Sequence, residues 1–220
     1  MFIKTLLVLH VAVLGYWLGA ELVINAMSRY VCLSGSMPMN ERTRLMHQVM
    51  HVDQHVRYAL VIQFGLGFAI AALFGYVPGG TTTAIAVGVF AAIWLTYVEV
   101  IHWLRHQPIG KRLAAFDRYS RYVLMAGLFA IAIGLIGGEW NLPFWIRVKL
   151  ALFAAVMACG VGIRLSVLAR FRTWAVMQRD GVTDEHNAIV KRTYFISTSI
   201  LVLLWLMIFT MVGISIYKPS

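Results

Sequence analysis

The residues that could do chemistry in this sequence are ionisable side chains within otherwise apolar segments. Glu99, His102 and His106 are spaced i, i+3 and i+7 at the end of one such segment, so a continuing helix would carry all three on one face. A carboxylate inside a membrane-length apolar segment is costly, and by default it marks a functional site. We therefore expect Glu99 and these histidines to belong to a site whose other members lie elsewhere in the chain.

Two further segments are expected to contribute to this site. His51 and His55 are i,i+4 neighbours on a second predicted helix, and Glu21 lies in the first apolar segment near the depth expected for Glu99. Imidazoles from two helices could be the two axial ligands of a haem, here His55 and His102. Imidazole and carboxylate together instead suit zinc, iron or copper, with Glu21, His51, His55, Glu99, His102 and His106 as the candidate ligands.

A purely structural interpretation of this cluster also stays open. Histidines at a membrane interface are often half-exposed beside basic loops, where they need no ligand. Glu99 could simply form an ion pair with Arg57 or Arg105.

A second, smaller pair is expected near the opposite membrane face. His10 lies about two turns into the first apolar segment, and Lys149 lies at a similar depth in the fifth. Together they could bind a propionate or another anion, or His10 could bind haem while Lys149 handles charge or protons. The structural alternatives are a hydrogen-bonded core imidazole and a lysine whose ammonium extends to the interface.

Composition and segment length predict how these residues are positioned. The 220 residues are 60% hydrophobic and 13% charged, and the mean hydropathy is +0.77, which is typical of a membrane helix bundle. We expect an all-α polytopic integral membrane protein, with residues 1–220 forming one membrane domain in contact with the lipid bilayer. Six apolar segments approach the roughly 20 residues that a bilayer core requires, and these are 3–28, 56–77, 83–104, 121–138, 144–169 and 193–216.

The basic residues predict the orientation of these helices. Links after the first, third and fifth segments are rich in Lys and Arg, whereas links after the second and fourth are short and almost uncharged. By the positive-inside rule, both termini lie on the periplasmic side of a bacterial inner membrane. The same placement accounts for the net charge of +10 without nucleic-acid binding. The second helix is expected to begin well before the membrane, and the sixth to begin after the N-cap residue Thr183.

Two short motifs resemble a known group of proteins. The first predicted helix contains LHVAVLGYWLG, in which His10 is followed after two turns by Trp17 and Gly19, and the fifth contains WIRVKLAL, with Trp145 one turn before Lys149. Both resemble helices of HemJ-type protoporphyrinogen oxidases and CopD-type copper-resistance membrane proteins, or of a related uncharacterised bacterial membrane family. The resemblance implies that His10 is a haem b ligand or catalytic base. It implies that Lys149 is a partner for the carboxylates of a substrate or haem.

We therefore expect a membrane redox protein that binds haem b or a transition metal through histidines on different helices. Its activity would be electron transfer, or oxidation of a quinone- or porphyrin-like substrate, together with a redox partner protein. One alternative is a transition-metal-ion transporter or copper-handling permease, and another is a non-catalytic membrane anchor or assembly subunit. A homo-oligomer or a hetero-oligomer is compatible with each.

Overall fold

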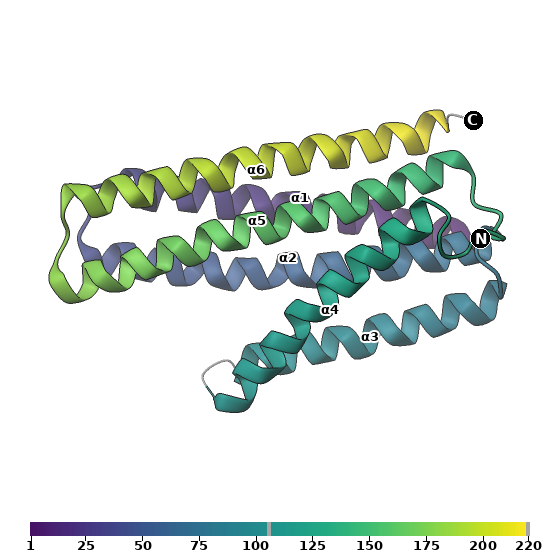
Figure 1. Ribbon diagram of the computed structural model, residues 1–220, viewed down its shortest axis with the longest axis horizontal. Coiled ribbons are helices and arrows are strands. Elements are labelled where there is room, and N and C mark those ends of the chain that lie inside the picture. Colours follow the sequence, from purple (N-terminus) through teal and green to yellow (C-terminus); the bar gives the residue numbers. More distant parts are fainter. Residues whose placement is uncertain (105–106, 219–220) are drawn as a thin grey trace.

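The computed structural model describes residues 1–104 and 107–218, and within these ranges the chain forms six helices and no strand (Figure 1). This confirms the all-α prediction. Both termini lie at one end of the bundle, which we call the termini end, and the α1–α2 and α5–α6 links lie at the other, the hairpin end. The helices are α1 (Phe2–Leu33), α2 (Met39–Leu73), α3 (Gly80–Leu104), α4 (Pro108–Ala132), α5 (Phe144–Asp180) and α6 (Asp184–Tyr217).

Five of the described helices, α1, α2, α3, α5 and α6, are long and apolar enough to cross a membrane. The fourth differs from the predicted segment 121–138. Helix α4 begins earlier, at Pro108, so its first half carries several charged residues, and it ends earlier, at Ala132. The early end has a backbone cause, because Gly134 and Gly137 adopt positive φ values of 79° and 68° and turn the chain out of the helix.

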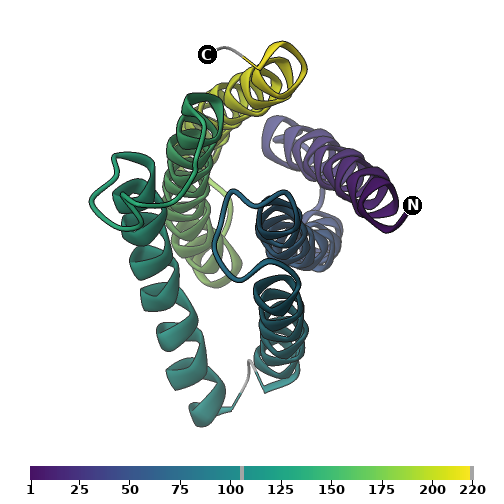
Figure 2. The same ribbon diagram turned by 90° about the vertical axis from the view of Figure 1, so that its right-hand side faces the viewer.

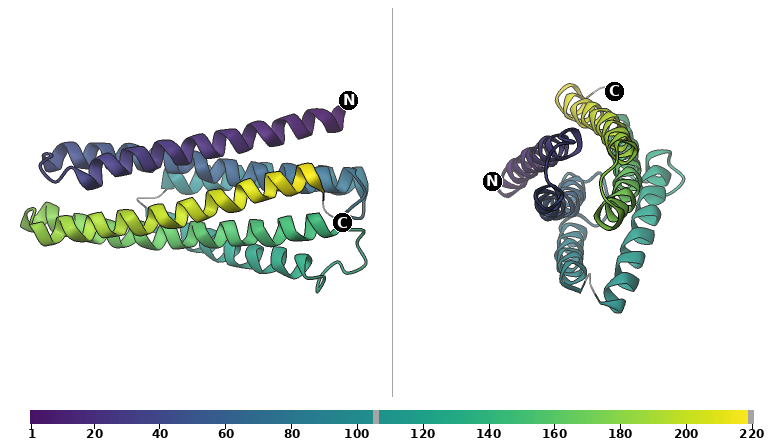
Figure 3. Two further views of the ribbon diagram at one scale, coloured as in Figure 1. Left: turned by 90° about the horizontal axis from the view of Figure 1, so that it is seen from above. Right: turned by 90° about the vertical axis from the view of Figure 1, so that its left-hand side faces the viewer.

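Four helices are much longer than the other two. Helices α1, α2, α5 and α6 have 32, 35, 37 and 34 residues, whereas α3 and α4 have 25 each. About ten extra residues add roughly 15 Å of helix, so these four extend beyond α3 and α4 at the hairpin end (Figures 1 and 3). We call this extension the head. The predicted early start of the second helix is confirmed, and so is Thr183 as the N-cap of α6, where its hydroxyl accepts a hydrogen bond from His186 N.

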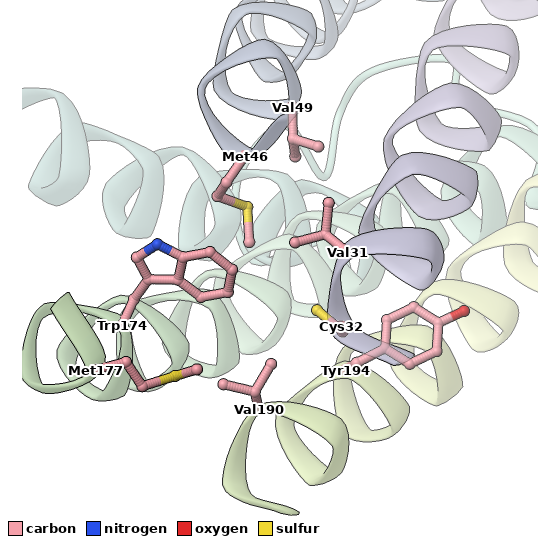
Figure 4. Packing of buried hydrophobic residues seen from close by; sticks show 8 residues of the cluster. All are labelled: Val31, Cys32, Met46, Val49, Trp174, Met177, Val190 and Tyr194. Carbon is pink, nitrogen blue, oxygen red and sulfur yellow. The ribbon is translucent and has the colours of Figure 1, made fainter. Parts of the chain in front are cut away.

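The head has its own apolar core, to which all four long helices contribute (Figure 4). Its buried side chains are two each from α1, α2, α5 and α6, namely Val31, Cys32, Met46, Val49, Trp174, Met177, Val190 and Tyr194. Nearer the middle of the bundle, a second core surrounds Trp17, which is 2% exposed. Burial of these side chains fixes the relative rotation of the four long helices.

The two shorter helices attach to the outside of this four-helix unit and also contact each other. Helix α3 packs along α2, while α4 packs along α5 and leans away from the bundle axis (Figure 2). The α2–α3 contact is close at one point, because a Cβ built on Gly65 would lie 2.7 Å from Cβ of Ala91. The small residue at 65 therefore sets the separation of these two helices.

Candidate functional site

His10 lies against α2 at membrane depth. Its Nε2 is 3.1 Å from the side-chain nitrogen of Gln63, and a Cβ built on Gly67 would lie 3.3 Å from its Cε1. At 1.5 Å per residue, His10 is about 12 Å from the start of α1, and Gln63 is about 15 Å from the end of α2. Both residues thus lie in the half of the bilayer nearer the termini end.

Lys149 approaches the same region from α5. Its Nζ donates a hydrogen bond of 2.8 Å to Ser215 Oγ on α6 and lies 5.6 Å from the centre of the Trp145 ring. The Lys149 ammonium is close enough to interact electrostatically with the His10 imidazole. We call His10, Gln63, Lys149 and Ser215 the His10 site, since one residue comes from each of the four long helices.

Two buried polar atoms of the His10 site have no hydrogen-bond partner among the described residues. They are Nδ1 of His10 and Oε1 of Gln63. Turning the Gln63 amide by 180° exchanges its oxygen and nitrogen, so that His10 Nε2–H donates to Oε1. As placed, the Gln63 amide nitrogen donates to Nε2, which leaves the ring proton on Nδ1; with the amide turned, its oxygen is satisfied and Nδ1 is the imidazole nitrogen with a free lone pair. The site then offers one basic nitrogen beside one cation.

An apolar groove lies between α1, α2 and α3, within about one turn of His10 along α1 and of Gln63 along α2, although no residue of the His10 site lines it. Its volume is about 470 Å³, and its lining includes Leu6, Ile62 and Leu66, which are sequence neighbours of His10 and Gln63, together with the small residues Gly88 and Ala92 of α3. Because almost all of its lining is apolar, the groove suits a hydrocarbon chain rather than a polar ligand.

The residues predicted as one cluster near the hairpin end are instead bonded mainly to aromatic side chains. Tyr16 Oη lies 2.5 Å from Nδ1 of His55. Tyr58 donates to Oε2 of Glu99, and Trp103 Nε1 donates to its Oε1 at 2.6 Å. The Glu99 carboxylate is therefore satisfied by a phenol and an indole.

The remaining cluster residues within the described ranges lie close by. The rings of His51 and His102 meet edge to face at 5.9 Å, and Trp17 Nε1 donates to Oε1 of Glu21 at 3.4 Å. Arg57 pairs with Asp53 at 3.2 Å and not with Glu99.

Within the part of the chain that the structure describes, no three His, Cys, Asp or Glu side chains are arranged to hold a metal ion. His106 and Arg105 lie outside the described residues, so their predicted parts, as a ligand and as a partner of Glu99, stay predictions.

Sequence reasoning missed the neutral partners of these sites. Three of these partners carry no charge and so do not stand out as candidate site residues in an apolar segment. They are Gln63, Tyr16 and Tyr58, and each forms a hydrogen bond with an ionisable residue. A usable signal existed for Gln63, since an amide within a membrane-length segment also requires a partner. No protein-family model, curated protein or solved structure matches this chain.

Proposed function

We propose that the chain is a membrane redox protein that binds a quinone- or porphyrin-like molecule at the His10 site. The observation that carries the proposal is the buried, unpartnered Nδ1 of His10 beside the Lys149 ammonium, at a depth where an apolar bundle gains nothing from either group. Resemblance of the His10 and Lys149 motifs to the HemJ and CopD group supports the same assignment.

Each residue of the site has a chemical task in this proposal. His10 uses its free nitrogen to accept a proton from the substrate or to bind a metal ion, while Gln63 holds the imidazole in one tautomer. Lys149, held by Ser215, attracts a carboxylate or a carbonyl oxygen of the bound molecule. The apolar groove beside the site receives the hydrocarbon part of the ligand.

Haem b fits this donor set as a bound group. His10 would hold the haem iron, and Lys149 would pair with a propionate. No second histidine of the described residues shares this depth, so the site offers one imidazole. When bound, haem b supplies one-electron redox chemistry, and the chain supplies its ligand, its charge partner and an apolar environment.

The orientation that we propose follows the distribution of basic residues. Both termini, and with them the His10 site, face the periplasmic side of a bacterial inner membrane, while the head stands in the cytoplasm. A redox partner protein that exchanges electrons with the site would dock at the termini end.

The test combines spectra with ligand titration on the full chain in detergent. Oxidised and dithionite-reduced absorption spectra are recorded for wild type, His10→Ala and the control His47→Ala, which alters an exposed histidine of the α2 head segment. Each protein is then titrated with haem, protoporphyrin IX and a short-chain ubiquinone, using tryptophan fluorescence, and its metal content is measured.

We expect binding of at least one of these ligands, weakened at least tenfold in His10→Ala and unchanged in His47→Ala. If haem is the ligand, a Soret band and reduced α and β bands appear and are lost with His10. Equal binding of every ligand by His10→Ala and wild type would exclude the His10 site. A protein that binds none of them would refute the proposal altogether.

A further inference from the structure

Three helices meet at a core that ends in arginines. Side chains of α2, α4 and α5 pack together around the buried Leu128, Ala154 and Met157, with Leu60 of α2 and Leu124 of α4 at its edge. On the hairpin side of this core, each of the three helices carries arginine within one or two turns. We call these residues, Arg57, Arg118, Arg121 and Arg164, the arginine cluster.

Two of the four arginines have intrahelical ion pairs. Arg57 pairs with Asp53 at 3.2 Å, and Arg121 pairs with Asp117 at 2.6 Å, each at i,i−4 spacing. Both guanidinium groups are partly buried, with side-chain exposures of 19% and 30%. These pairs neutralise half of the positive charge.

The other two arginines have no such partner. Arg118 and Arg164 form no hydrogen bond or ion pair with any residue of 1–104 and 107–218, and both are exposed. Arg164 nevertheless lies within electrostatic range of the other three arginines, Arg57, Arg118 and Arg121, as well as of the Asp53 carboxylate that pairs with Arg57. Four arginines and two aspartates give a local charge of +2, so positive charge exceeds negative charge where the three helices meet.

The depth of the cluster matches the lipid headgroups. Counting 1.5 Å per residue, Arg57 lies about 24 Å from the end of α2 and Arg164 about 30 Å from the start of α5, near the far edge of a hydrocarbon core of about 30 Å. Large apolar side chains next to the cluster face outward, including Val123 at 71% and Leu165 at 63% exposure. A ligand here would meet cations at one end and apolar surface at the other.

We propose that the arginine cluster binds the headgroup of an anionic phospholipid, with the two unpaired guanidinium groups of Arg118 and Arg164 on its phosphates. A lipid with two phosphates supplies the two negative charges that balance the cluster. Its acyl chains lie on the outward apolar side chains of α4 and α5. This lipid also bridges α4, which leans away from the bundle, to α5 and α2 (Figure 2).

Lipid binding is tested on the full chain purified in mild detergent. Native mass spectrometry records the lipid that remains bound, and thermal unfolding is followed while tetraoleoyl cardiolipin, phosphatidylcholine or inorganic phosphate is added. The test variant is Arg118→Gln/Arg164→Gln. The control is Arg172→Gln, an exposed arginine two turns further along α5, in the head.

We expect wild type and the control to retain cardiolipin and to gain thermal stability from it. The double variant should bind cardiolipin roughly thirty-fold more weakly, because two arginine contacts to the headgroup are removed. Circular dichroism is used to check that the double variant is folded. Equal cardiolipin binding by the double variant and the control would overturn the proposal. Equal protection by phosphatidylcholine would exclude recognition of the charge, and equal protection by inorganic phosphate would assign the cluster to a free anion.

Discussion

Replacement of Arg42 by methionine should leave the protein at least as stable as it is now. Arg42 is fully buried in the head, at 0% exposure, with its guanidinium 5.1 Å from the centre of the Trp174 ring. Its Nη1 donates to Asn187 Oδ1 at 3.0 Å, but Nε and Nη2 have no partner among the described residues. One hydrogen bond and one aromatic face thus compensate a charge that has been removed from water.

The magnitude follows from that incomplete compensation. Replacing a buried charge by a well-packed apolar side chain is commonly neutral or stabilising, by about 1–4 kcal/mol. Asn187→Ala is the opposite change, because it keeps the charge and removes its hydrogen bond, at a cost of about 1.5–3 kcal/mol. For a chain of this length, 1 kcal/mol corresponds to about 2–4 °C in Tm. Arg42→Met should therefore not lower the Tm, whereas Asn187→Ala should lower it by about 3–12 °C.

The assay is thermal unfolding in detergent at one scan rate, followed by tryptophan fluorescence. Arg42→Lys is the companion variant, since it keeps a buried charge but loses the planar contact with Trp174. It should be less stable than Arg42→Met. A fall of more than about 5 °C in the Tm of Arg42→Met would refute the reasoning. It would mean that Nε and Nη2 of Arg42 make interactions that stabilise the fold by more than about 1 kcal/mol.

Two further changes test the packing and the capping. Gly65→Leu should lower the Tm by about 2–10 °C, because its Cβ alone would overlap Ala91 and force α2 and α3 apart. Gly88→Leu is the control, since no atom lies within 4 Å of a Cβ built at that position. A similar loss of Tm in both variants would contradict the packing argument. Thr183→Ala should lower the Tm by about 2–4 °C, through loss of the N-cap bond to His186 N. Thr183→Ser restores an acceptor and should recover most of the loss, and failure to recover would remove the cap from the explanation.

The helices could be predicted from the sequence because hydropathy and charge act over whole segments. The early start of α2 and the capping of α6 by Thr183 depend on residues close together in the sequence, so both could be predicted from it. The end of α4 was harder, because Ile133 to Gly138 is apolar enough to continue a span, and only the positive φ of Gly134 and Gly137 shows where the helix ends.

The sites were only partly predictable, because their geometry depends on helix rotation. The depth of His10 and Lys149 follows from counting residues, and the structure places them within electrostatic range of each other. Glu99 and His55 also lie near one level, but they are joined through Tyr58, which donates to Glu99 and meets the His55 ring edge to face at 6.0 Å because the packing of the helices places it between them. That packing is a property of tertiary structure and leaves no trace in spacing alone.

The connectivity of the four long helices has a consequence for the order of assembly. Helices α1 and α2 pack along each other as one hairpin, and α5 and α6 as another, so both hairpins form from contacts that are short in sequence. Residues from both hairpins are needed for the core of the head and for the bond between Arg42 and Asn187. During synthesis, Arg42 and Cys32 therefore stay uncovered until the first turns of α6 are made, since Asn187, Val190 and Tyr194 lie there. Closure of the head is thus a late folding step that requires both hairpins and precedes completion of the last span.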